Sequence, residues 1–219
     1  FTSQGHGGDV HLPLLAEVKR RARIPIIGNG GVCSPHDAWR MLRETGADAL
    51  YGDAGDDLIL GNEGNDLIVG GDGVDRLYGG IGDDALYGSA GDDQLYGESG
   101  DDSLYGNAGR DRVYGGDGND LLHGNEDDDH LLGEAGDDTL FGDAGADLLE
   151  GGSGADVLHG GIGNDVLLAG VGLGKILYGD DGDDTIIGAD SGGNDSDLFD
   201  GIYVGDRIKL PGEEKYEYA

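Results

Sequence analysis

The chain has 219 residues and a formal net charge of −33, with 46 Asp and Glu residues against 13 Lys and Arg. It contains 48 Gly but only three Phe and one Trp, too few large apolar side chains for a conventional globular core over most of its length. The charge disfavours nucleic acid and anionic membranes as partners, since both would repel the chain. The one cysteine, Cys33, excludes an internal disulfide framework, and no apolar stretch is long enough to span a membrane.

The first 51 residues differ from the rest in charge. They hold five acidic and six basic residues, a net of +1, and the charge changes sharply at residue 52. Helical spacing of apolar residues, an N-terminal cap and two short apolar runs predict a helix over 13–23, a strand over 24–28, a helix from Ser34, and a strand over 47–51. This order of elements is typical of a small α/β segment.

Residues 52–168 divide into thirteen consecutive nine-residue units without a gap, beginning GDAGDDLIL, GNEGNDLIV and GGDGVDRLY. Position 1 is Gly in all thirteen and position 4 in twelve, the exception being Asp127. We therefore expect two tight turns per unit through backbone conformations that a Cβ disfavours. Position 6 is always Asp, and position 8 is always aliphatic. The aliphatic residue predicts the inward side chain of a three-residue strand.

These units fit the nonapeptide G-G-x-G-x-D-x-U-x, and residues 52–187 resemble the RTX (repeats-in-toxin, haemolysin-type) calcium-binding family. The resemblance implies an all-β solenoid: a right-handed parallel β-roll in which two units make one turn, units i and i+2 stack, and calcium lies between stacked loops. It implies that loop carbonyls and the position-6 carboxylates bind the metal. The implied metal-binding aspartates are Asp57, Asp66, Asp75, Asp84, Asp93, Asp102, Asp111, Asp120, Asp129, Asp138, Asp147, Asp156, Asp165 and Asp184.

Charge and entropy indicate why such a fold needs a metal. One buried aliphatic side chain per unit cannot offset the backbone entropy of nine ordered residues, many of them Gly. Residues 52–168 contain 29 acidic residues and three Arg, a net of −26, and stacking thirteen units creates eleven inter-loop sites, so that Ca²⁺ would supply +22. A hard cation with oxygen ligands would offset most of the repulsion. We therefore expect calcium binding and folding to be one event.

Position 9 holds Tyr in units 3 to 7. Alternate units fall on different sheets, so these residues are expected to stack as two ladders, either stabilising adjacent turns or forming a surface for a glycan or protein partner. The expected ladders are Tyr78, Tyr96 and Tyr114 on one sheet, and Tyr87 and Tyr105 on the other.

The histidines at position 9 and the aspartates at position 5 of the unit each allow more than one interpretation. His123 and His159 share position 9 but lie two turns apart, too far for one zinc ion, and are interpreted as surface histidines. The aspartates at position 5 are either extra metal ligands or solvated turn formers, and since this position also accepts other residues it is not a required ligand. They are Asp56, Asp83, Asp92, Asp101, Asp128 and Asp137.

After Leu168 the frame breaks. Ala169 reads as an insertion, and residues 170–178 (GVGLGKILY) carry Lys175 where other units have Asp. We expect this loop to bind no metal, with Lys175 standing where a cation would otherwise lie. Residues 179–187 restore the motif, and residues 188–219 form a looser C-terminal cap and tail in which Ile208 indicates a closing strand.

The N-terminal segment carries a second resemblance. Residues 2–50, which include IPIIGNGGVCSPHDAWRMLRETGADAL, resemble the last third of a tRNA-dihydrouridine synthase, a flavin-dependent (β/α)₈ barrel enzyme. The GNG loop (Gly28-Asn29-Gly30) helps to seat the FMN phosphate in that family. The family's catalytic-cysteine segment is missing, Cys33 does not take its place, and Tyr51-Gly52-Asp53 replaces a Gly-Arg pair. We expect neither catalysis nor FMN binding, and interpret residues 1–51 as a remnant that caps the roll.

The sequence therefore predicts a calcium-binding β-roll module, without enzymatic activity, of a secreted, extracellular bacterial protein. By resemblance, such a module stays unfolded in the calcium-poor cytoplasm, passes through the type I secretion machinery and folds outside. The alternatives are a fragment of an FMN-dependent tRNA-dihydrouridine synthase fused to the repeats, and an adhesin-like structural solenoid. Because the sequence starts at Phe1 and its one methionine is Met41, we expect a piece of a longer protein.

Overall fold

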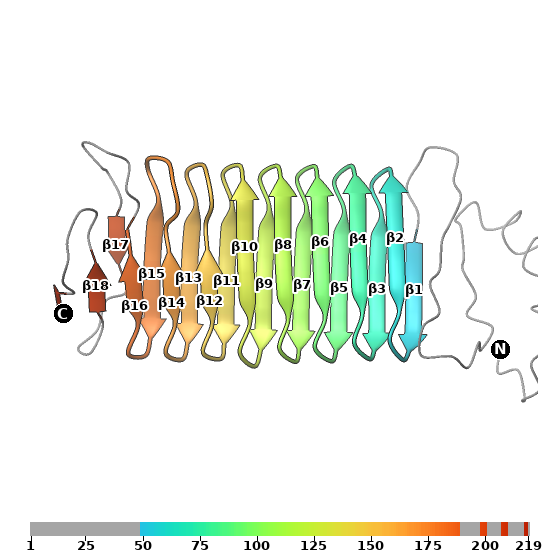
Figure 1. Ribbon diagram of the computed structural model, residues 1–219, viewed down its shortest axis with the longest axis horizontal. Coiled ribbons are helices and arrows are strands. Elements are labelled where there is room, and N and C mark those ends of the chain that lie inside the picture. The colour runs from blue at the N-terminus through green and yellow to red at the C-terminus, as the bar shows by residue number, and fades with distance from the viewer. Residues whose placement is uncertain (1–48, 189–197, 201–206, 210–216, 219) are drawn as a thin grey trace, which may run out of the picture.

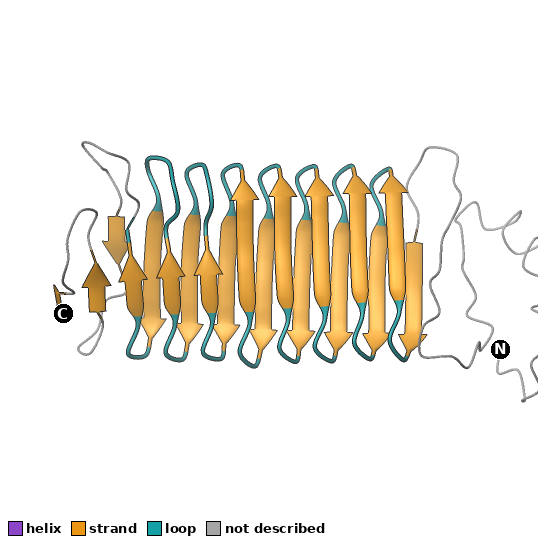
Figure 2. Ribbon diagram, viewed as in Figure 1, coloured by secondary structure: helices purple, strands orange, loops and turns teal. Residues whose placement is uncertain are grey.

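The computed structural model describes residues 49–188, 198–200, 207–209 and 217–218. The expected α/β segment covers residues 1–51, and its residues 1–48, with the capping role assigned to it, lie outside the described residues. Every element that is described is a β-strand, and the strands form an elongated stack of two facing sheets joined by turns at both edges (Figures 1 and 2). In this part of the chain no helix is long and apolar enough to cross a membrane.

The strands recur at the period of the nonapeptide. They are β1 (Ala49–Ala54), β2 (Leu58–Glu63), β3 (Leu67–Asp72), β4 (Arg76–Ile81), β5 (Ala85–Ala90), β6 (Gln94–Ser99), β7 (Ser103–Ala108), β8 (Arg112–Asp117), β9 (Leu121–Glu126), β10 (His130–Ala135), β11 (Thr139–Ala144), β12 (Leu148–Glu150), β13 (Val157–Ile162), β14 (Val166–Leu168), β15 (Ile176–Asp181), β16 (Thr185–Ile187), β17 (Leu198–Asp200), β18 (Arg207–Lys209) and β19 (Glu217–Tyr218). The closing strand expected around Ile208 is present as β18.

The strand order confirms the predicted all-β solenoid. Strands β1 to β17 with odd numbers form one sheet, and the even-numbered strands with β19 form the other. Neighbouring strands within a sheet are parallel and two units apart, as in the pairing of Leu86 with Leu104 and of Leu95 with Val113. Only β18 and β19 pair antiparallel within the described residues. Units i and i+2 therefore stack, and two units make one turn of the roll.

Position 8 supplies the interior. Side chains alternate between the two faces of a strand, so position 8 points inward while positions 7 and 9 lie on the outer face and remain half-buried or exposed. One column of aliphatic side chains runs through each sheet, from Leu50 to Leu177 in the odd-numbered sheet and from Ile59 to Ile186 in the even-numbered sheet, and the central members are fully buried. This column confirms the inward aliphatic residue predicted for every unit.

Strands β1 to β11, β13 and β15 have six residues, longer than the three expected, whereas β12, β14, β16, β17 and β18 have three. A regular strand such as β7 covers positions 7, 8, 9, 1, 2 and 3, and the turn is confined to positions 4 to 6. Asn107 at position 2 has φ of 78°, and its neighbours on the strand still pair with β9. Pairing therefore continues around the corner of the roll, because a residue in the left-handed region bends the strand without ending it.

Positions 1 and 4 of the unit require Gly for different physical reasons. Position 4 has the backbone conformation that the sequence predicts, whereas position 1 does not. Gly109 at position 4 has φ of 125°, a region that favours Gly. Gly88 at position 1 is outside that region, but a Cβ there would overlap the Asp93 carboxylate and lie 2.7 Å from the Gly106 carbonyl oxygen. Position 1 is therefore Gly because the position-6 carboxylate packs against it.

The irregular unit after Leu168 also differs from the expected frame. Ser153 still pairs with Val171 at an offset of 18 residues, whereas Val157 pairs with Ile176 at an offset of 19. The extra residue consequently lies in the turn between Val171 and Ile176, and Ala169 is not an insertion. Ala169 instead occupies position 1 of a ten-residue unit, AGVGLGKILY.

Candidate metal centre

The position-6 aspartates form one continuous row along each edge of the roll. The backbone N–H of each donates to the Oδ1 atom of the aspartate one turn further on, as from Asp93 to Asp111 and from Asp111 to Asp129, both at 2.7 Å. Twelve such links connect the predicted metal-binding residues. One edge carries Asp57, Asp75, Asp93, Asp111, Asp129, Asp147, Asp165 and Asp184, and the other carries Asp66, Asp84, Asp102, Asp120, Asp138 and Asp156.

The second carboxylate oxygen of these residues is buried and, over most of each row, accepts no hydrogen bond. The aspartate side chains are at most 3% exposed from Asp66 to Asp184. Within the described residues the Oδ2 atoms without a hydrogen-bond donor are those of Asp75, Asp84, Asp93, Asp102, Asp111, Asp120, Asp129, Asp138, Asp147 and Asp165. An ionised oxygen buried without a donor is costly, so each of these atoms calls for a cation or a proton.

The electrostatics of the rows point the same way. Burial raises the pKa of Asp93 and Asp111 from 3.8 to about 7 and that of Asp129 to about 8, and neighbouring carboxylates add to the rise. The hydrogen bond from the preceding turn's amide lowers the pKa but does not offset burial. At neutral pH, ionising the rows is therefore costly unless a cation compensates their charge.

The donor set fits calcium. The described residues contain no group of three or more His, Cys, Asp or Glu side chains of the kind that would enclose a metal by themselves. Each turn instead offers one carboxylate beside the carbonyl oxygens of stacked Gly-rich loops, such as that of Gly106 next to Gly88. Carboxylate and carbonyl oxygens are the ligands of hard cations. A bound Ca²⁺ would supply positive charge here, and the position-6 aspartates would hold it.

The position-5 side chains make a second, exposed set of links. Asp83 Oδ1 accepts from the Asp101 amide at 3.2 Å, and Asp101 Oδ1 accepts from the Asn119 amide at 2.8 Å. Asn119 Oδ1 in turn accepts from the Asp137 amide at 2.9 Å. Asn makes the same bond as Asp, and Val74 and Ala146 occupy the position without any side-chain acceptor, so this position requires no charge. The geometry favours turn formers over extra metal ligands.

Lys175 is the exception in these rows. Its side chain is fully buried, and its ammonium donates to Asp156 Oδ2 and, at 3.3 Å, to the carbonyl oxygen of Gly152. Burial raises the pKa of Asp156, and the hydrogen bond from Lys175 opposes this rise. The ammonium thus compensates the one Oδ2 atom between Asp75 and Asp165 that has a hydrogen-bond donor.

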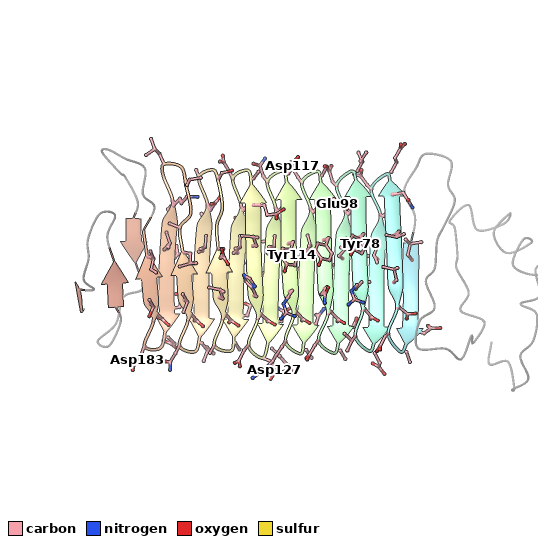
Figure 3. All side chains as sticks on the ribbon, in the orientation of Figure 1. Tyr78, Glu98, Tyr114, Asp117, Asp127 and Asp183 are labelled. Carbon is pink, nitrogen blue, oxygen red and sulfur yellow. The ribbon has the colours of Figure 1, made fainter. Side chains whose placement is uncertain are left out.

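The aromatic ladders are present on both outer faces. On the even-numbered sheet the ring centroids of Tyr78 and Tyr96 lie 4.7 Å apart and those of Tyr96 and Tyr114 lie 4.8 Å apart, as predicted. Figure 3 shows Tyr78 and Tyr114 on the face between the acidic edges marked by Asp117 and Asp127. The rings are stacked nearly parallel, so each ring covers the face of the next and leaves mainly edges to solvent.

The ladder on the odd-numbered sheet is longer than predicted. It continues from Tyr87 and Tyr105 through His123, Phe141, His159 and Tyr178, with successive centroids 4.3 to 5.1 Å apart. His123 bonds Asp143 at 2.8 Å, and His159 bonds Asp180 at 3.2 Å. Phe141 separates the two imidazoles, which therefore do not share a metal. The sequence does contain the pattern of the longer ladder, because position 9 of alternate units holds Tyr, His or Phe, and all three types stack in one ladder.

Comparison with known proteins agrees with this geometry. Residues 44–77, 69–104, 78–113, 105–140, 114–149 and 141–172 match the RTX calcium-binding nonapeptide repeat (4 copies). Residues 3–52 match the dihydrouridine synthase family. The chain is 40% identical over 47 residues to tRNA-dihydrouridine synthase B of Xanthomonas axonopodis pv. citri (strain 306), a match that spans 22% of the chain but only 14% of that protein. Since the repeat matches extend over residues 44–172, more than half of its length, the chain belongs to the RTX calcium-binding nonapeptide repeat family.

Proposed function

We propose that the roll is a calcium-folded module of a secreted bacterial protein, and that it acts as a binding and structural element without catalysis. The observation that supports this best is the pair of rows of buried carboxylates, in which ten Oδ2 atoms accept no hydrogen bond. A calcium ion between stacked turns would compensate these oxygens and bridge adjacent turns of the roll. Up to twelve ions correspond to the twelve carboxylate links.

Without calcium the same rows oppose folding. The repeats carry a net charge of −26 over residues 52–168, and folding brings the carboxylates into register one turn apart. In the unfolded chain these groups are solvated and far apart, so the repulsion and the desolvation cost are absent. A chain that stays unfolded where calcium is scarce would suit export through the type I machinery, with folding outside the cell. The activity of any larger parent protein is independent of this mechanism.

Far-UV circular dichroism during a calcium titration tests the proposal, with magnesium as the control ion. We expect a cooperative coil-to-β transition with calcium and none at equal magnesium, since Mg²⁺ requires tighter octahedral geometry and gives up its water reluctantly. Asp102→Asn should raise the calcium midpoint several-fold, whereas Asp101→Asn, at the neighbouring exposed position 5, should leave it nearly unchanged. A chain that is already folded in chelator would disprove calcium-coupled folding.

The match over residues 3–52 supports a second candidate, a dihydrouridine synthase fragment fused to the repeats. We propose that this fragment has no flavin chemistry of its own, because Tyr51-Gly52-Asp53 stands where the resembled family has a Gly-Arg pair at the phosphate site. Visible absorbance of the purified chain is the test. A bound flavin, recognised by its absorbance and released on denaturation, would restore the enzyme hypothesis.

A further inference from the structure

The irregular unit over residues 169–178 departs from the nonapeptide in three ways that are linked in space. Position 1 is Ala169 instead of Gly, the turn contains one extra residue, and Lys175 occupies the place of the position-6 Asp. Lys175 belongs to the edge whose carboxylate row ends at Asp156. Because all three departures fall in one unit, they indicate that the cation site of this unit differs from the sites of the regular units.

The presence of Ala169 follows from the change at Lys175. In a regular unit a Cβ at position 1 would overlap the Oδ2 atom of the same unit's aspartate, as at Gly88 and Gly151. Lys175 carries no such oxygen, and its long side chain extends to the preceding turn of the stack, where it meets Asp156. The space next to position 1 is therefore available, and Ala169 fills it with its side chain fully buried.

The turn that carries Lys175 is also longer than a regular turn. A lysine side chain is several atoms longer than an aspartate, and the turn between Val171 and Ile176 that carries it is one residue longer than a regular turn. Its Nζ atom then contacts Asp156 Oδ2 and the Gly152 carbonyl oxygen, one carboxylate and one loop carbonyl. These are the two kinds of oxygen that a calcium ion would take as ligands.

We propose that Lys175 is a covalently attached replacement for one calcium ion, so that the turn over residues 169–175 is closed by an internal cation and takes up no metal. The inference rests on the proposed calcium function of the other turns. The two edges of the roll then differ: one row remains calcium-dependent as far as Asp184, and the other ends in a cation that cannot be removed by a chelator.

Counting bound calcium by native mass spectrometry of the full chain tests the proposal. The informative variant combines Ala169→Gly, deletion of Gly174 and Lys175→Asp, which converts AGVGLGKILY into the regular nonapeptide GGVGLDILY. At saturating calcium this variant should bind one ion more than the parent chain, thirteen against twelve if every link holds an ion. Equal counts in two folded proteins would overturn the role of Lys175, whereas a parent chain that binds no calcium would overturn the proposed function itself.

A second variant keeps the proposal testable if the redesigned turn does not fold. Lys175→Met removes the ammonium at similar side-chain length and leaves Asp156 Oδ2 buried without a cation. Hydrogen exchange at saturating calcium should become at least tenfold faster in β15, next to this turn. Arg110→Met is the matched control, because Arg110 is 68% exposed and its bond to Asp128 is at the surface. Unchanged exchange in the Lys175 variant would refute the internal cation.

Discussion

Acidification in the presence of a chelator should promote folding of the metal-free roll. Burial raises the pKa of Asp93, Asp102 and Asp111 from 3.8 to about 7 in the folded chain. A shift of this size means that holding one such carboxylate ionised costs about 4 kcal/mol of folding free energy. A few of these costs equal the whole stability of a typical domain, about 5–15 kcal/mol. The metal-free chain should therefore be unfolded at pH 8.

The sign of the pH dependence follows from the direction of the shifts. The folded pKa values lie above the unfolded value, so the folded state is penalised least below about pH 3.8, increasingly as the pH rises from there, and fully above about pH 6 to 8. At neutral pH bound calcium should allow the roll to fold, because it compensates these oxygens in place of protons. Protons and calcium both stabilise the folded state at these oxygens, so the calcium concentration at the folding midpoint should fall as the pH falls below about 7, while each folded site binds calcium more weakly.

Far-UV circular dichroism in chelator, recorded from pH 8 down to pH 4, measures the first effect. The sequence pI is about 4.1, so light scattering at low protein concentration must separate folding from precipitation. Replacing Asp93 and Asp111 by Asn should reduce the pH dependence, whereas Asp92→Asn, at exposed position 5, should not. A metal-free chain that gains no β-structure on acidification, together with a calcium midpoint that ignores pH, would refute buried charge as the barrier to folding.

Three further predictions concern packing. Gly88→Ala should destabilise the calcium-loaded roll because its Cβ would overlap Asp93 Oδ2, whereas Ala90→Ser, two residues away and exposed, should be neutral by thermal unfolding; equal melting temperatures would contradict the close approach. Leu104→Ala, in the fully buried column, should cost about 2–5 kcal/mol in calcium-saturated denaturant unfolding, and a smaller loss would mean that the roll collapses around the gap. Tyr96→Ala interrupts two stacked pairs and should cost about 1–3 kcal/mol without changing the number of bound calcium ions, which native mass spectrometry would check.

Much of the fold could be predicted from residue patterns because the repeat restricts the choices. An aliphatic residue every nine positions between Gly-rich turns leaves a stacked coil as the arrangement that buries Leu86 on Leu104 and Leu95 on Val113. The pairing of Tyr78 with Tyr96 follows from the same register. Strand length was not predictable in this way, since pairing continues through Asn107 in a conformation that its residue type permits but does not require.

The sequence by itself determined the period, the inward column, the acidic position and the family, because each is a property repeated in every unit and independent of its surroundings. Only the tertiary structure decided why position 1 is Gly, where the extra residue of the irregular unit lies, and what Lys175 contacts. The place of the extra residue and the contact of Lys175 with Asp156 depend on residues 18 or 19 positions away, and a Cβ at Gly88 would meet both Asp93 of its own unit and Gly106 of the next turn. The physical reason is that a linear pattern records which side chains recur, whereas clashes and charge compensation arise only when the turns are stacked.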